Sequence, residues 1–270
     1  MSRDLLLLFF RKEIRDLRTN RQLWPGYLLL PVLAIALPVL LLVGLPPILA
    51  SEASADPAVR MLLDTAANDP RLRGATLLER MARLLVRDSA LFYLFMPVVL
   101  AAGAAALAIV REKEQRTLEP ILATPLRDRE LLWAKLIAVL GPPVLLTWAT
   151  ALAGMAVTGI ASSLLAGVVI GPTGGNLVGI FLLAPLLAAA GALAGIGVSA
   201  RLGDSQAAAQ FTGLAVVPVT LLVVAVLGRP AMMSPLVGLG GGVIVLGIAA
   251  LLFRGVLGRI RREELLTGWR

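Results

Sequence analysis

Long hydrophobic runs with almost no charged residues alternate with polar segments along the chain. A transmembrane helix needs about 20 apolar residues to cross the hydrocarbon core of a bilayer. Six runs reach this length, at residues 24–50, 89–110, 134–157, 177–200, 207–227 and 236–253. The pattern therefore predicts an all-α, polytopic membrane protein with six transmembrane helices in a single membrane domain, residues 1–270.

Prolines are frequent inside these runs. In a membrane, neighbouring helices or water can satisfy the backbone groups that a proline frees, so kinked helices are expected and not broken ones. The positions concerned are Pro31, Pro38, Pro142, Pro143, Pro185 and Pro218. Pairs of glycines four residues apart, at Gly191 and Gly195 and at Gly238 and Gly242, are expected to permit close packing of helices.

The N-terminal segment, residues 1–23, has the pattern of an amphipathic helix that lies on the membrane surface. Apolar side chains recur at helical spacing on one face, and arginines occupy another face, where they suit an anionic cytoplasmic leaflet. The predicted surface helix uses Phe10, Arg11, Ile14, Arg15, Leu17 and Arg18.

Residues 51–88 predict a small helical insert on the other side of the membrane, after the first span. Asp56 and Pro57 can begin one helix, and Thr76 with Glu79 can form the capping box of a second helix that carries Leu77, Met81 and Leu84 on one face. The insert could pack as a lid on its own spans or meet an extracytoplasmic partner.

Charge sets the orientation of the chain. The protein is 58% hydrophobic and 16% charged with a net charge of +8, and its mean hydropathy is +0.88. Of its 25 lysines and arginines, 18 lie in the N-terminal segment, residues 111–135, the loop at Arg201 and the tail 254–270. The positive-inside rule places both termini and the 111–133 loop in the cytoplasm. This distribution explains the positive charge by topology, so no nucleic-acid partner is expected.

The missing residue types exclude several function classes. There is no histidine and no cysteine. All acidic and basic residues belong to segments outside the spans, counting Lys135 with the loop before the third span. No intramembrane ionisable group is then available for a coupling ion, although sodium could still bind backbone carbonyls of a broken helix. No zinc-protease motif and no phosphate-binding loop occurs, so the chain is not expected to be an enzyme or to bind a cofactor or metal.

The 111–133 loop is the most charged segment between two spans. Thr117 can cap a short helix, residues 118–123, with Glu119 in its first turn, and Thr124 before Pro125 ends it. Asp128 can cap the next helix. The apolar side of the short helix suits insertion into a groove on a partner protein, or alternatively contact with lipid headgroups.

At these residues the sequence resembles a known family. Residues 112–119 read EKEQRTLE, residues 121–126 read ILATPL, residues 130–132 read ELL, and residue 135 is lysine. This series is similar to the signature E-R-E-x-G-T-L-E-x-L-L-x-T-P-[LV]…E-[LI]-[LIV]-x-[GA]-K of permease subunits of type-2 ATP-binding-cassette (ABC) exporters. Arg116 stands where the family commonly has glycine, and Pro120 replaces the usual helix former. Residues 12–17, KEIRDL, are similar to the family's N-terminal elbow helix.

The resemblance implies a permease subunit of an ATP-driven exporter in the cytoplasmic membrane of a prokaryote. It implies a separate P-loop ATPase subunit that binds ATP and Mg²⁺, and a second permease subunit, either the same or different. The coupling helix that docks on the ATPase would comprise Thr117, Leu118, Glu119, Ile121, Leu122, Thr124, Pro125 and Leu126. Flanking polar contacts would come from Arg111, Glu112, Glu114, Glu130 and Lys135. The competing interpretations are an ion-coupled carrier or channel and a non-transporting membrane scaffold.

Overall fold

The computed structural model describes four long stretches of the chain and a few isolated positions. The stretches are residues 19–50, 77–114, 128–199 and 234–259, and the isolated positions are 11, 15, 57, 60, 61, 64, 207, 210, 212, 213 and 216. The predicted coupling helix lies outside the described residues, as do most of the predicted fifth span and the C-terminal tail beyond residue 259.

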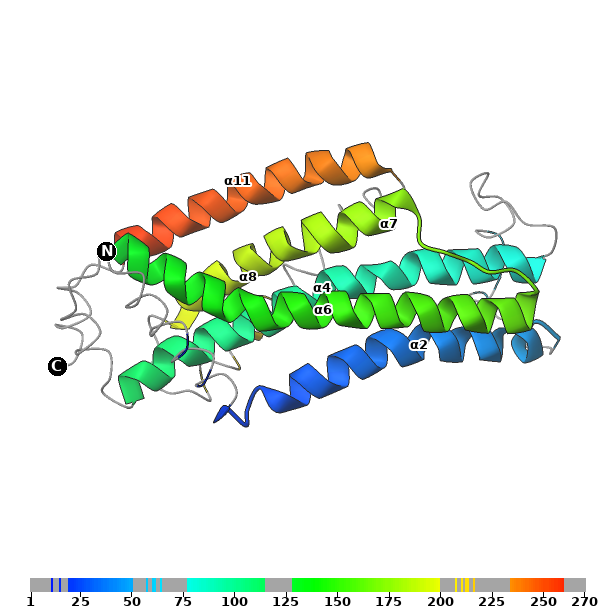
Figure 1. The fold of residues 1–270 in the computed structure, drawn as a ribbon, viewed down its shortest axis with the longest axis horizontal. Coiled ribbons are helices and arrows are strands. Elements are labelled where there is room, and N and C mark those ends of the chain that lie inside the picture. The colour runs from blue at the N-terminus through cyan, green and yellow to red at the C-terminus, as the bar shows by residue number, and fades with distance from the viewer. Residues whose placement is uncertain are drawn as a thin grey trace.

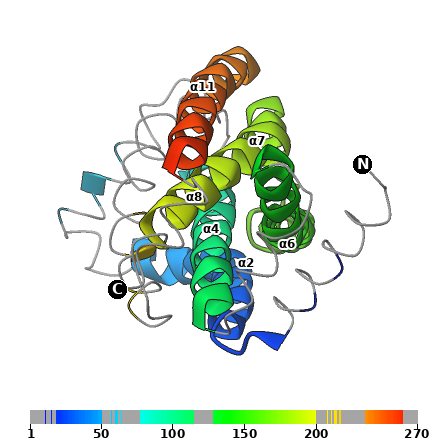
Figure 2. The same cartoon turned by 90° about the vertical axis from the view of Figure 1, so that its left-hand side faces the viewer.

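The described stretches fold into helices packed side by side (Figures 1 and 2). In chain order these are α2 (Trp24–Ala50), α4 (Leu77–Glu114), α6 (Asp128–Ala166), α7 (Gly174–Val178), the π-helical turn η2 (Gly179–Leu183), α8 (Ala184–Ser199) and α11 (Pro235–Arg259). In Figure 1, α2 and α6 run in one direction and α4, α8 and α11 run in the other. The bundle therefore has a 111–128 end, where α4 stops and α6 starts, and a 166–174 end, where α6 stops and α7 starts.

Five of the described helical segments are long and apolar enough to cross a membrane: Trp24–Gly44, Ala82–Ala108, Lys135–Ala166, Gly174–Gly197 and Pro235–Val256. Each of them overlaps a predicted span. The prediction of an α-helical, multi-pass membrane protein is therefore confirmed. The predicted span at residues 207–227 is described at only five positions and stays a prediction.

The boundary between the external insert and the second span differs from the prediction. The second predicted insert helix does not stand apart, because α4 continues without a break from Leu77 to Glu114. Glu79 forms an ion pair of 2.7 Å with Arg83, one turn further along. No glycine or proline interrupts the first two turns of α4, and the spacing of the ion pair supports a helix. The helix therefore carries its charged first turns directly into the apolar span.

Prolines do not end the helices, as predicted. α4 contains Pro97, and α6 contains the pair Pro142 and Pro143. α6 also extends beyond the predicted end of the third span and stops at Ala166. The next residue, Gly167, has a φ angle of +67°. Because glycine adopts this left-handed conformation readily, it can end a helix there.

α4 forms the centre of the bundle, between α2, α6 and α8 (Figure 2). Within its apolar segment 71% of the residues are buried, against 17% in α2 and 28% in α11. Among the described helices, α4 and α8 share the most extensive contact, and their backbones approach closely. A Cβ added at Gly191 would lie 2.7 Å from a methyl carbon of Val98, and one at Gly195 would lie 3.2 Å from the Cα of Ala102. The predicted close approach at Gly191 and Gly195 is thus confirmed.

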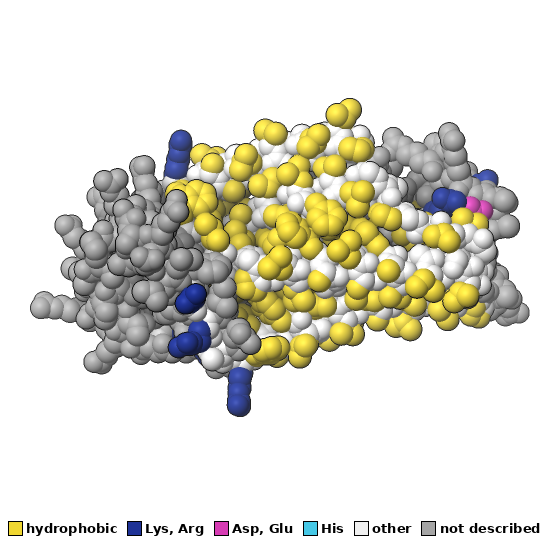
Figure 3. All heavy atoms as spheres, viewed as in Figure 1, with side chains coloured by type: hydrophobic (Ala, Val, Ile, Leu, Met, Phe, Trp, Pro, Cys, Tyr) yellow, Lys and Arg dark blue, Asp and Glu magenta, His cyan; other side chains and the backbone are white. Residues whose placement is uncertain are grey.

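The outer surface is apolar along the middle of the bundle. Figure 3 shows hydrophobic side chains over this region on the face in view, with charged side chains toward both ends. Large exposed side chains of this belt include Leu28, Leu40, Leu145, Leu152, Val243 and Leu251. Such a surface would be unfavourable in water and matches the hydrocarbon core of a bilayer.

Candidate functional site

The predicted coupling helix falls between two described helices. All eight residues assigned to it lie in the gap between Glu114 and Asp128, outside the described residues, so their conformation stays a prediction. The helices on either side are described. α4 carries Arg111, Glu112 and Glu114 in its last turn, and α6 begins at Asp128 and contains Glu130. Both helix ends lie at the 111–128 end of the bundle (Figure 1), so the polar segment 115–127 joins two neighbouring helices.

Charge at the two helix ends is asymmetric. Asp128 and Glu130 lie at the N-terminus of α6, where the helix dipole favours negative charge. Glu112 and Glu114 lie at the C-terminus of α4, where the dipole disfavours it. Arg111, in the same turn, is partly buried. The last turn of α4 therefore contains two acidic residues, Glu112 and Glu114, beside two basic ones, Arg111 and Lys113, and the helix dipole favours only the basic pair there.

Lys135 does not lie on the surface of this end. The structure places it in α6, about two turns after Asp128, with 6% of its surface exposed. The residue interacts with another part of the protein. Lys135 is therefore part of the packed end of the bundle, and its predicted role as a flanking contact toward a partner subunit stays a prediction.

The predicted membrane-surface helix is described at only two of its six residues. Arg11 and Arg15 are both helical and exposed. The hydroxyl of Thr19 donates a hydrogen bond of 3.1 Å to the carbonyl oxygen of Arg15, one helical turn before it. Phe10, Ile14, Leu17 and Arg18 lie outside the described residues. The helix on the membrane surface stays a prediction.

An aromatic contact joins α6 to α11 close to the 111–128 end. The rings of Trp133 and Phe253 have centroids 4.8 Å apart at an angle of 34°. The contact was not predicted from the sequence, because the two positions are far apart along the chain. The contact fixes the start of α6, the helix that directly follows the polar segment, against a second helix.

A second feature that sequence analysis missed lies where α6 meets η2. The backbone nitrogen of Ala184 donates to the carbonyl of Gly179, five residues earlier, which is the π-helical pattern. In this pattern the carbonyl of Ile180 would pair with the nitrogen of Pro185, which carries no hydrogen. The indole nitrogen of Trp148 donates a hydrogen bond of 3.2 Å to that carbonyl instead. Only Pro185 was visible as a signal in the sequence.

Polar side chains also gather near the 166–174 end. Thr158 and Ser162 of α6 bond back to carbonyl oxygens of their own helix, and the Ser162 hydroxyl also accepts a bond of 3.1 Å from the backbone nitrogen of Ile170. Thr173 caps α7 by accepting a bond from the backbone nitrogen of Asn176. Within the described residues, no three acidic side chains come together as they would to hold a metal ion.

The chain matches the model of a known protein family over most of its length. The family model described as "ABC-2 family transporter protein" matches residues 7–240. No curated protein matches the sequence. The matched range includes the surface-helix segment, the 111–133 loop and the first five predicted spans, so the resemblance seen at residues 112–135 is confirmed. The chain therefore belongs to the ABC-2 transporter family and is a multi-pass permease of an ABC transporter.

Proposed function

We propose that this permease exports its cargo and is driven by a separate P-loop ATPase that docks on residues 115–127. The observation that supports this most is the position of the segment, which joins the end of α4 to the start of α6. Both helices extend over the distance between the 111–128 end and the 166–174 end of the bundle. α6 has 39 residues and spans about 58 Å at 1.5 Å per residue. A displacement of the segment would therefore act on two helices that reach both ends of the bundle.

In this proposal the ATPase partner binds ATP and Mg²⁺, and the permease supplies the docking helix and the pathway. Leu118, Ile121 and Leu122 insert into a groove on the ATPase, as an amphipathic helix does. Glu112 and Glu114, which the dipole of α4 disfavours, pair with basic groups of that subunit. Closure of the ATPase pair moves the docked helix, and α4 and α6 carry the motion to the opposite end.

The proposed orientation places the 111–128 end and both termini in the cytoplasm of a prokaryotic cell. The excess of lysine and arginine in the segments at this end supports it. A second permease subunit, identical or different, completes the pathway. The cargo is proposed to be amphiphilic, because every described span is strongly apolar.

The docking helix is tested by changing one apolar and one charged residue. Leu122→Asp places a charge in the proposed groove, and Glu119→Arg reverses a charge in the first turn. Loss of a buried anchor costs about 2 kcal/mol or more, which is about a thirtyfold loss of affinity. We expect both variants to reach the membrane in normal amounts but to lose the ATPase during purification. We also expect that cargo no longer stimulates ATP hydrolysis in either variant.

A matched control is Asp64→Arg, because Asp64 is exposed in the segment before α4, away from the 115–127 loop along the chain. It makes the same type of charge reversal as Glu119→Arg and should leave ATPase binding unchanged. Normal ATPase binding by Leu122→Asp would contradict the docking assignment. Accumulation of cargo by the purified permease alone, in vesicles with an ion gradient and no ATPase, would favour an ion-coupled carrier instead.

A further inference from the structure

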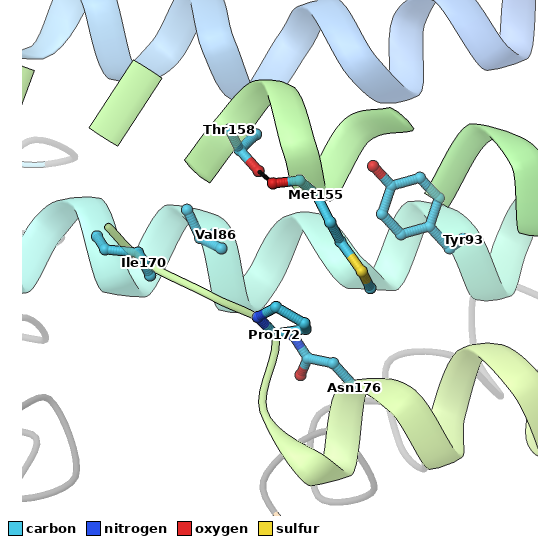
Figure 4. Close-up of a pocket in the computed structure, with 7 residues that line it drawn as sticks. All are labelled: Val86, Tyr93, Met155, Thr158, Ile170, Pro172 and Asn176. Atoms are coloured by element: carbon cyan, nitrogen blue, oxygen red, sulfur yellow. Dashed lines mark hydrogen bonds between the residues drawn. The ribbon is translucent and has the colours of Figure 1, made fainter. Parts of the chain in front are cut away.

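A small cavity lies near the 166–174 end of the bundle, among α4, α6 and α7 (Figure 4). Its volume is about 10 Å³, which is about the space that one water molecule needs. It is lined by Val86, Tyr93, Met155, Thr158, Ile170, Pro172 and Asn176. A cavity lined only by apolar side chains would stay dry, but three of these side chains carry polar atoms.

The three polar side chains are deeply buried. Tyr93, Thr158 and Asn176 expose 3%, 4% and 2% of their surfaces. Their positions are closely constrained. A Cβ at residue 154 would overlap the hydroxyl of Tyr93, so only Gly154 leaves room for that ring. The cavity is therefore bordered by three buried polar side chains, and the ring of Tyr93 is held in place at Gly154.

Each of these side chains keeps hydrogen-bonding capacity. The Thr158 hydroxyl donates to the carbonyl of Gly154 at 2.7 Å, which leaves its oxygen able to accept. The Asn176 amide oxygen accepts from the Thr173 hydroxyl at 2.8 Å, and no hydrogen bond of the amide nitrogen is found among the described residues. Tyr93 also lines the cavity, and no hydrogen bond of its hydroxyl is found within the described part of the chain.

The cavity thus offers a donor from Asn176, an acceptor from Thr158 and a hydroxyl of Tyr93 that can do either. Buried polar groups without partners are costly, and a buried water typically makes two to four hydrogen bonds to such groups. We propose that the cavity binds one ordered water molecule, which bridges α4, α6 and α7. This site is independent of the proposed ATPase docking, which concerns the other end of the bundle.

The first test uses the sign of a stability change. Tyr93→Phe removes only a hydroxyl. If that hydroxyl binds water, the variant loses a hydrogen bond, and we expect its Tm to fall by about 2–4 °C. If the cavity is dry, the same change removes an unpaired polar group, and the Tm should stay the same or rise.

Tyr27→Phe is the matched control. The hydroxyl of Tyr27 is buried, has no hydrogen-bond partner among the described residues and does not line the cavity. Its removal should leave the Tm unchanged or raise it. The full chain is measured in detergent without cargo. A Tm of Tyr93→Phe that is equal to or above that of the wild type, as for Tyr27→Phe, would overturn the proposal.

The second test detects the water directly. Radiolysis in ¹⁸O-labelled water oxidises side chains beside bound water, and the sulfur of Met155 lines the cavity. Met96 is buried with 1% exposed and does not line it, so it serves as the reference. Because Met155 is itself partly exposed, the decisive comparison is between the wild type and Asn176→Leu, which replaces the amide by an apolar side chain of similar size. We expect labelling of Met155 to fall severalfold in this variant and labelling of Met96 to stay unchanged. Equal labelling in the wild type, or labelling that Asn176→Leu leaves unchanged, would refute the bound water.

Discussion

The contact between α4 and α8 allows a quantitative test with a single methyl group. In Gly195→Ala the new Cβ would overlap the carbonyl oxygen of Ala102 and lie 3.1 Å from its carbonyl carbon. Carbon atoms in favourable contact are about 3.5–4.0 Å apart, so the two helices must separate by about 0.5 Å or more. The obstacle is backbone, which cannot turn aside as a side chain can.

The expected cost follows from the contacts that this separation weakens. A gap of about 0.5–1 Å forfeits about a quarter to a half of each contact energy of about 0.1–0.2 kcal/mol. Over a few tens of atom pairs the loss is about 1–2 kcal/mol, which agrees with the cost of about 1–3 kcal/mol for overpacked cores. Alanine is favoured over glycine in a helix by about 0.5–1 kcal/mol, so the net loss is about 1 kcal/mol.

Gly103→Ala is the matched control on α4, because a Cβ there would meet nothing within 4 Å. It should gain the helix preference without the clash and raise the free energy of unfolding by about 0.5–1 kcal/mol. Thermal unfolding in detergent compares the two variants. We expect the Tm of Gly195→Ala to lie below that of Gly103→Ala by about 3–8 °C, at about 2–4 °C per kcal/mol. Equal Tm values would show that α4 and α8 do not pack this closely.

Two further matched pairs test local backbone features. Trp148→Phe removes the donor to the Ile180 carbonyl and should lower the Tm by about 2–4 °C or more, since this buried acceptor is left unpaired; Trp133→Phe, at a residue 53% exposed, should have a smaller effect. Gly167→Ala forces a side chain into the left-handed region at φ +67° and should cost about 1 kcal/mol by chemical denaturation. Gly171→Ala, also exposed and without neighbours within 4 Å, should cost nothing.

Hydrophobic length and helix capping predicted most of the described helices. The first span was expected at residues 24–50, and α2 has these bounds. Asp128 was expected to begin a helix, and α6 starts there. Both features depend on residues close together in the chain. A continuous apolar run must be helical in lipid to satisfy its own backbone, and an acidic side chain can cap the backbone nitrogens directly after it.

The start of α4 was harder to predict because hydropathy and helix formation report different properties. Arg87 and Asp88 mark the point where the chain becomes polar, and the second span was therefore expected to begin at residue 89. A polar residue ends the favourable contact with lipid, but it does not end a helix. Residues 77–88 contain no glycine or proline, so the helix includes these charged residues and begins at Leu77.

Contacts between residues far apart in the chain could not be predicted from the sequence. Pro185 indicates that one carbonyl loses its partner, but nothing in the sequence shows that Trp148 of another helix supplies the replacement. In the same way Tyr93 appears as one neutral polar residue within an apolar run, and Thr158 and Asn176 appear as neutral polar residues just outside the third and fourth predicted spans. Only the packing of α4, α6 and α7 brings them to one cavity. These polar contacts inside the bundle therefore depend on the tertiary structure and cannot be predicted from the local sequence.

The course of α6 indicates where a force applied at residues 115–127 would be taken up. Pro142 and Pro143 lack backbone hydrogens, so the carbonyls one turn before them lose their usual helical partners, and the helix is weakest there. Beyond this point the helix is attached by the Trp148 bond to η2 and by Ser162, which accepts a bond from Ile170. We therefore expect a force at the start of α6 to bend the helix at the proline pair before it breaks those attachments. Because the contact between Trp133 and Phe253 holds the start of α6 against α11, we expect a docked partner to move the part of α6 before Pro142 together with α11.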